Sequence, residues 1–91
     1  MNEQRLREAL VERGRSLYDR GYAHGSSGNL SARVDDGILV TPTGSSLGRL
    51  DPARIAKVDA NGVHVTGDPP SKEAFLHLAM YAERPGANAI V

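Results

Sequence analysis

The chain has 91 residues and no cysteine, so it holds at most one domain and has neither a disulfide nor a thiolate metal ligand. Its 11 Lys and Arg residues balance its 11 Asp and Glu residues, and this absence of a basic excess argues against a nucleic-acid partner. No apolar run approaches the roughly 20 residues that span a bilayer, and the charged N-terminal segment is unlike a signal peptide. We therefore expect a cytoplasmic protein that has no membrane partner.

The first predicted element is an amphipathic helix over residues 2–22. Its apolar and glycine residues recur every three or four positions, which places them on one stripe of a helix. These residues are Leu6, Leu10, Gly14, Leu17, Tyr18 and Gly21. A glycine inside a helix costs about 1 kcal/mol relative to alanine, so we expect Gly14 to let another backbone segment approach closely.

Two β-hairpins are predicted next. Each pairs two short apolar runs around a turn that is rich in Asp, Asn or Gly. The strands of the first hairpin are residues 30–34 and 38–41, and those of the second are residues 55–58 and 63–66. Between the hairpins, Asp51 and Pro52 favour a single helical turn over residues 50–54, because Asp caps a helix and Pro fits its first position.

The last predicted elements are a helix over residues 71–82 and the start of a strand over residues 88–91. Ser71 is the expected N-cap, and Pro85 stops the helix. The residues expected in the core are Phe75, Leu78, Ala79 and Ala82 of this helix, together with Tyr18, Tyr22 and Tyr81. These elements predict an α/β fold with a central mixed or antiparallel sheet flanked by helices.

The predicted helices and strands need more partner surface than 91 residues supply. Ile90 and Val91 are also typical of a sheet interior. We therefore expect residues 1–91 to form the N-terminal part of a larger single domain.

Three loops consist of small polar residues, namely residues 25–29, 41–48 and 67–73. Taken singly, each can be an ordinary turn, because Gly, Ser and Asn favour turns. The alternative is that glycines allow the backbone to approach an anion while hydroxyl and N–H groups face it. The third loop also leads into a helix N-terminus, which favours negative charge. Three such loops in one short chain indicate a pocket for a phosphate or a carboxylate.

Glu73 lies at that helix start and has two interpretations. It can be a first-turn carboxylate that stabilises the helix dipole by roughly 0.3–1 kcal/mol, or it can be a functional group. A capping box would place the acid at position 74, which is Ala74, so Glu73 is not needed for that role. His24, His64 and His77 show no metal-binding spacing, so the chain holds no complete metal site.

The three loops occur in an order and spacing that resemble the class II aldolase/adducin family. The matching segments are Ser27–Arg33, Thr41–Gly48 and Pro70–Glu73, with a further match over Arg84–Val91, and the resemblance runs from about Leu6 onward. Within the family the chain looks closest to decarboxylases of 3-oxo-tetronate 4-phosphates, on the strength of residues 41–52 and Ser71-Lys72-Glu73. Fuculose-phosphate aldolases tend to have a second small hydroxyl residue where Lys72 stands. The resemblance implies a three-layer α/β/α domain.

The resemblance also implies a role for each loop. Glu73 would be the catalytic acid and base, and it would also be a ligand of the family's zinc ion (Zn2+), whose remaining histidine ligands would follow Val91 in a His-x-His segment. The family usually forms homotetramers. The residues that would bind the substrate phosphate, or a carboxylate in the case of the lysine, are Gly28, Asn29, Thr43, Gly44, Ser71 and Lys72.

The implied activity is that of a zinc-dependent carbon–carbon lyase that converts a 3-oxo-tetronate 4-phosphate to dihydroxyacetone phosphate. Zinc would stabilise the enediolate that loss of CO2 leaves, and a buried Glu73 would deliver a proton to carbon. Two alternatives stay open. One is a class II sugar-phosphate aldolase, which breaks a different carbon–carbon bond, and the other is an interaction module without activity, as in adducin heads.

Overall fold

The computed structural model describes residues 2–23, 25 and 28–91. His24, Ser26 and Ser27 of the first polar loop lie outside the described residues. Within the described part, the chain forms two α-helices, one short 3-10 helix and five strands. Their bounds are α1 (Glu3–Asp19), β1 (Ser31–Val34), β2 (Gly37–Val40), η1 (Leu47–Arg49), β3 (Ala56–Asp59), β4 (His64–Thr66), α2 (Ala74–Glu83) and β5 (Ala89–Ile90).

The five strands form one sheet in the order β4-β3-β2-β1-β5. All four pairings are antiparallel, so among the described residues the sheet is antiparallel rather than mixed. The two predicted hairpins are present, and the predicted final strand, β5, pairs with β1 so that Ile90 lies opposite Ser31.

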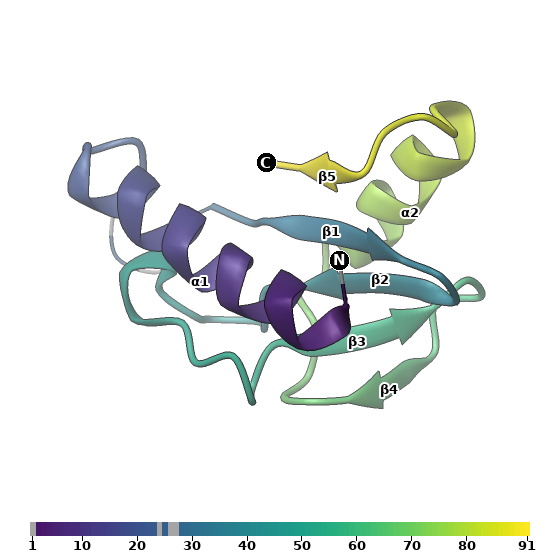
Figure 1. Ribbon diagram of the computed structural model, residues 1–91, viewed down its shortest axis with the longest axis horizontal. Coiled ribbons are helices and arrows are strands. Elements are labelled where there is room, and N and C mark those ends of the chain that lie inside the picture. The colour runs from purple at the N-terminus through teal and green to yellow at the C-terminus, as the bar shows by residue number, and fades with distance from the viewer. Residues whose placement is uncertain (1, 24, 26–27) are drawn as a thin grey trace.

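The two helices cover opposite faces of this sheet (Figure 1). Side chains alternate between the faces of a strand, so Leu39 packs with Leu10 of α1 while its neighbours Ile38 and Val40 pack with Tyr81 of α2. Each fully buried aliphatic side chain of this kind stabilises the fold by roughly 1.5–3 kcal/mol. The predicted α/β class, with a central sheet between helices, is confirmed.

Helix α1 ends at Asp19, three residues before the predicted end. Gly21 follows the helix with φ +79°, a left-handed conformation that glycine adopts without strain. The N–H of Gly21 donates to the carbonyl of Tyr18 at 3.1 Å, and that of Tyr22 donates to Leu17 at 3.0 Å. This pair of bonds is a Schellman motif, which satisfies the last carbonyls of the helix.

Gly14 has the role that its position predicted. A β-carbon added there would lie 2.7 Å from the carbonyl oxygen of Leu47 and 2.9 Å from Cδ1 of Leu50. Both distances are shorter than a carbon can occupy, so the missing side chain allows α1 to contact η1 directly.

A 3-10 helix that the sequence did not predict, η1 (Leu47–Arg49), lies just before the predicted helical turn. The predicted turn itself is present over residues 52–54. Asp51 still caps that turn, because its Oδ1 accepts from the N–H of Ala53 at 2.9 Å and its carbonyl accepts from Arg54 at 3.0 Å.

Two predictions about α2 are wrong. The helix begins at Ala74, with Glu73 rather than Ser71 at the N-cap. Its buried residues are Ala74, His77 and Tyr81, whereas Phe75 is 69% exposed and Ala79 and Ala82 are exposed. The helix is rotated because the sheet presents the Ser31 hydroxyl to it, and this hydroxyl pairs with both His77 and Tyr81. Tyr18 and Tyr22 are likewise exposed.

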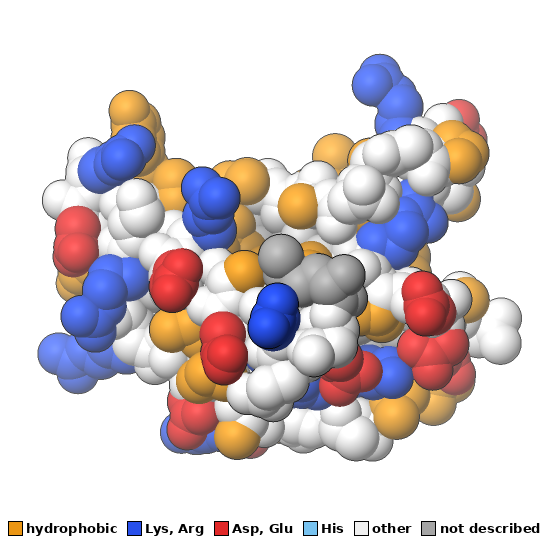
Figure 2. Space-filling view, viewed as in Figure 1, with side chains coloured by type: hydrophobic (Ala, Val, Ile, Leu, Met, Phe, Trp, Pro, Cys, Tyr) orange, Lys and Arg blue, Asp and Glu red, His pale blue; other side chains and the backbone are white. Residues whose placement is uncertain are grey.

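Most charged residues of α1 face solvent, whereas Arg7 is buried. Figure 2 shows blue and red side chains interspersed on the face that α1 occupies in Figure 1. None of the described helices is long and apolar enough to cross a membrane.

Candidate functional site

The structure brings two of the three polar loops side by side. The N–H of Thr43 donates to the carbonyl of Pro69 at 2.9 Å, and the N–H of Ser71 donates to the carbonyl of Thr41 at 3.1 Å. Between these bonds, Pro42 and Pro70 form an antiparallel bridge. The segment that follows β2 is therefore joined through its backbone to the segment that precedes α2.

Asn29 connects the remaining loop to both of these segments. Its side-chain Nδ2 donates to Oε2 of Glu73, and its Oδ1 accepts a hydrogen bond from the Thr41 hydroxyl at 3.2 Å. Side chains from loops that lie 12 and 32 residues apart in sequence thus meet at one point. The three polar loops are therefore joined at the Glu73 carboxylate through the Asn29 side chain.

Glu73 is held by the turn that begins at Ser71. The buried Ser71 hydroxyl accepts from the N–H of Glu73 at 3.2 Å, and the Ser71 carbonyl accepts from the N–H of Ala74 at 3.0 Å. The carboxylate therefore lies at the positive end of the helix dipole. Glu73 is exposed, so the expectation that it is buried is wrong for the described residues.

The other predicted phosphate ligands have surroundings of their own, and none of their contacts among the described residues is to the Glu73 carboxylate. Gly28 and Gly44 adopt φ values of +88° and +69°, which only glycine takes readily. Thr43 and Gly44 line a cavity of about 190 Å³ together with Arg49, Arg54, Asp51 and Asp68. Lys72 is exposed beside Glu73, and Gly28 lies against the side chain of Leu47.

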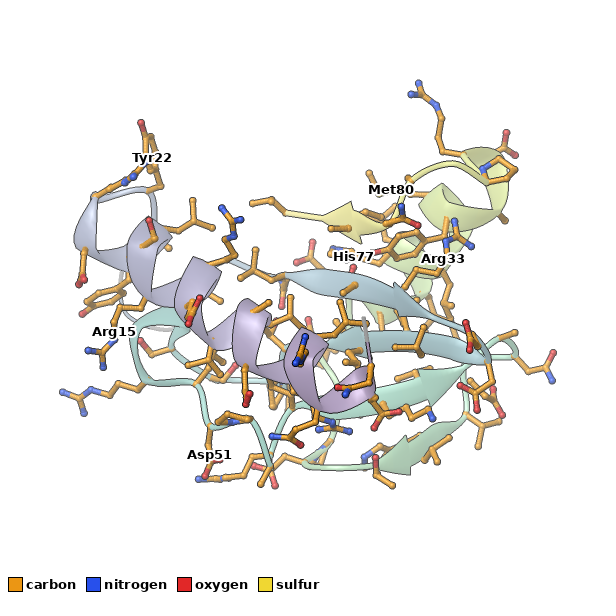
Figure 3. All side chains as sticks on the ribbon, in the orientation of Figure 1. Arg15, Tyr22, Arg33, Asp51, His77 and Met80 are labelled. Atoms are coloured by element: carbon orange, nitrogen blue, oxygen red, sulfur yellow. The ribbon has the colours of Figure 1, made fainter. Side chains whose placement is uncertain are left out.

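A buried polar cluster lies behind Glu73, between α2 and the sheet. His77, one turn after Glu73, places its Nδ1 2.6 Å from the Ser31 hydroxyl, which is also 2.8 Å from the Tyr81 hydroxyl. Burial lowers the pKa of His77, and the charge of Glu73 opposes this shift. Figure 3 shows His77 and Arg33 beside β1. His77 therefore has a structural role between α2 and β1.

Sequence reasoning did not single out Thr41, Ser31 or Tyr81 as neighbours of the site. A signal was available for Ser31 alone, because a small hydroxyl residue in an otherwise apolar strand suggests a buried polar partner. In the sequence Thr41 ends a predicted strand and begins the second polar loop, and neither position marks it as a partner of Asn29. Its position beneath Asn29 and Glu73 emerges only when the loops are paired.

The comparison of the chain with known proteins agrees with the resemblance drawn from its loops. The sequence pattern of the Class II Aldolase and Adducin N-terminal domain matches residues 8–91. The chain belongs to the class II aldolase and adducin family. This membership confirms the resemblance to the family, while the roles that it implies for single residues stay predictions.

Family members with similar sequences are named either as decarboxylases or as aldolases. A 3-oxo-tetronate 4-phosphate decarboxylase of Cupriavidus necator is 53% identical over 98% of the chain and 41% of its own length. The L-fuculose phosphate aldolase of Escherichia coli K12 is 37% identical over 100% of the chain and 42% of its own length. The crystal structure of YgbL from Klebsiella pneumoniae superposes with a TM-score of 0.94 at 48% identity, over 98% of the chain and 44% of YgbL.

The chain therefore spans less than half the length of the class II aldolase relatives that it matches. Among its described residues, no group of three or more His, Asp or Glu side chains is placed to hold a metal ion. Glu73 is the one predicted ligand in this part of the chain. The described residues by themselves do not fit a zinc ion, and the zinc implied by the resemblance stays a prediction.

Proposed function

We propose that the protein carrying this chain is a carbon–carbon lyase that decarboxylates a 3-oxo-tetronate 4-phosphate to dihydroxyacetone phosphate. The observation that carries the proposal is the meeting of Asn29, Thr41 and Glu73 from three separate loops. The names of relatives that are 53% identical over nearly the whole chain support the substrate class.

The phosphate of this substrate is assigned to the loop backbones. Gly44 is exposed in a left-handed conformation, and no atom of the described residues lies within 4 Å of an added β-carbon, so an anion can approach the backbone of this loop closely. The N-terminus of α2 and the Lys72 ammonium add positive potential beside it. Gly28, Asn29, Thr43 and Ser71 complete the proposed set of ligands.

Glu73 is assigned the proton transfer. A 3-oxo acid loses CO2 when the bond between its carboxyl carbon and C2 breaks, and the electron pair of that bond passes into the adjacent keto group. C2 then takes up one proton to give dihydroxyacetone phosphate. Glu73 reaches solvent and accepts a hydrogen bond from Asn29, so it is placed both to deliver this proton and to regain one.

An L-fuculose phosphate aldolase is the second candidate, because such an enzyme is 37% identical over the whole chain. Lys72 favours the decarboxylase, since fuculose-phosphate aldolases tend to have a small hydroxyl residue there. Zinc as cofactor, a homotetrameric assembly and a cytoplasmic location are proposed with the activity. Metal analysis and mass measurement of the purified protein test the first two.

The experiment is a substrate panel with the protein expressed from its intact gene. We expect CO2 and dihydroxyacetone phosphate from 3-oxo-tetronate 4-phosphates, and no aldehyde from L-fuculose 1-phosphate. Aldehyde release without CO2 release would show that the activity is that of the aldolase and not of the decarboxylase. If neither product forms with the metal-loaded protein, the enzyme assignment is wrong and the chain is an interaction module.

A further inference from the structure

The Asn29 side chain can present either of two groups to Glu73. With its Nδ2 toward Glu73 it donates a hydrogen bond to the carboxylate, as the structure has it. With the amide rotated by half a turn, its carbonyl oxygen would face the carboxylate, and two acceptors would repel each other. Whatever holds the amide in the first orientation therefore contributes to the geometry of Glu73.

Thr41 holds that orientation through its hydroxyl group. The hydroxyl oxygen accepts from the N–H of Leu30 at 3.3 Å, which leaves the single hydroxyl proton to donate to Oδ1 of Asn29 at 3.2 Å. A rotated amide would turn its NH2 group toward the hydroxyl and leave that proton without its acceptor. The Thr41 hydroxyl thus selects the oxygen end of the amide.

The position of Thr41 is itself strongly determined. Its side chain is fully buried, its N–H donates to the carbonyl of Leu30 at 3.0 Å, and its carbonyl accepts from the N–H of Ser71 at 3.1 Å. One residue is therefore bonded to the Asn29 loop and to the segment that carries Glu73. Thr41 therefore has little freedom to move with a displaced Asn29 amide, and it keeps the Asn29 loop and the Glu73 segment in place.

We propose that Thr41 is a positioning residue, whose hydroxyl fixes the Asn29 amide so that its NH2 group faces Glu73. This inference rests on the proposed function for its catalytic consequence, because Thr41 itself contacts neither the carboxylate nor the substrate. The orientation of the Asn29 amide does not depend on which reaction the protein catalyses.

The experiment compares Thr41→Val, which keeps the shape and loses the hydroxyl, with Thr41→Ser, which keeps the hydroxyl. Both are made in the protein expressed from its intact gene, with Ile38→Val on β2, the strand that Thr41 follows, as a control for core packing. The first readout is the pair of side-chain amide signals of Asn29 in 1H–15N spectra of asparagine-labelled protein, identified by their loss in Asn29→Asp. We expect these signals to move in Thr41→Val and in Glu73→Gln, and to stay in place in Thr41→Ser and Ile38→Val.

The second readout is catalysis. We expect Thr41→Val to lower kcat about tenfold or more with KM within about threefold, and Thr41→Ser to retain kcat within about threefold. In an Asn29→Ala background the Thr41→Val change should have no further effect on kcat, because coupled residues are not additive. A merely structural role would instead lower activity equally in both backgrounds.

The two readouts separate the failure of this inference from the failure of the proposed function. If the Asn29 signals of Thr41→Val coincide with those of the unaltered protein, Thr41 does not orient the amide and the inference is wrong. If the signals move as expected but the unaltered protein turns over none of the proposed substrates, the positioning role stands and the proposed function falls. Should Thr41→Val fail to fold, displaced Asn29 signals in Thr41→Ser would count against the inference.

Discussion

Arg7 shows how one charged side chain can be buried in a small domain. Its guanidinium donates to the carbonyls of Ile55 at 2.6 Å and Pro52 at 3.0 Å and to the Thr66 hydroxyl at 3.2 Å, and it pairs with Glu3. These bonds attach α1 to the loop before β3 and to β4. A guanidinium suits this role because its planar set of N–H donors serves several acceptors at once.

Replacing Arg7 with Met should therefore destabilise the fold. Met keeps most of the apolar stem, but it leaves the buried carbonyl of Ile55 and the partly buried carbonyl of Pro52 without their donor, and an unsatisfied buried group costs about 1–3 kcal/mol. We expect the free energy of unfolding in urea to fall by about 2–4 kcal/mol. Arg5→Met on the exposed face of the same helix is the control and should change it by less than about 0.5 kcal/mol. Equal loss in both variants would refute the assigned role of Arg7.

At the scale of elements, the contact between α1 and η1 depends on Gly14. Intrinsic helix propensity favours alanine over glycine by about 1 kcal/mol, whereas an added β-carbon would lie 2.7 Å from the Leu47 carbonyl oxygen. The contacted atom belongs to the backbone and cannot rotate away, so the steric term outweighs the propensity.

Gly14→Ala should accordingly lower the thermal midpoint, with a net loss of about 1–3 kcal/mol. Gly86→Ala provides the opposite case, because no atom lies within 4 Å of its added β-carbon and its φ is not positive. That variant should be neutral or more stable by up to about 1 kcal/mol. A stabilised Gly14→Ala would contradict the close packing of α1 on η1.

The strands and α1 could be predicted from sequence because their signals are local. Alternating apolar residues and Asp-Gly or Asn-Gly turns specify the hairpins. Gly14, a glycine in the middle of a predicted helix, indicated that another segment packs closely against that helix. The face of α2 could not be predicted in this way. Apolarity alone favours burial of Phe75, and the burial of His77 depends on a hydroxyl at Ser31, 46 residues away.

At the scale of the whole molecule, the candidate site forms because loops that are distant in sequence pair through their backbones. The family motif indicated which loops belong together, but it could not indicate that Glu73 is exposed or that Thr41 lies beneath Asn29. Both follow from the register in which residues 41–43 meet residues 69–71. The expectation that residues 1–91 are part of a larger domain stays a prediction. The exposed apolar side chains that such a domain would cover are Phe75, Leu76, Met80, Val63 and Val65.

An ion-pair network that joins α1 to the sheet predicts how stability depends on pH. Lys57 lies 2.9 Å from Glu3 and 3.2 Å from Asp36. The hydrogen bond from Lys57, followed by that from Arg7, lowers the pKa of Glu3 below its usual value of 4.5. A carboxyl group whose pKa is lower in the folded state stabilises the fold above its unfolded pKa, and this contribution is lost as pH falls through the folded value.

Glu3→Gln should therefore be less stable than the unaltered protein at pH 7, by no more than about 1 kcal/mol because the pair is partly exposed to solvent. The difference should shrink as the pH is lowered from 5 towards about 3. Thermal unfolding at each pH measures it, with Glu8→Gln on the exposed side of α1 as the control. A difference that does not change with pH would show that the ion pair is not its cause.

The central claim is that Glu73, held by Asn29 where three loops meet, transfers the proton. The direct measurement is kcat of Glu73→Gln on the substrate that the panel identifies, together with the dissociation constant for dihydroxyacetone phosphate, with Glu83→Gln in the same helix as the control. We predict that kcat falls by about 10²–10⁴-fold in Glu73→Gln alone, while the dissociation constant changes by less than about threefold. Turnover of Glu73→Gln at the rate of the unaltered protein would contradict the account.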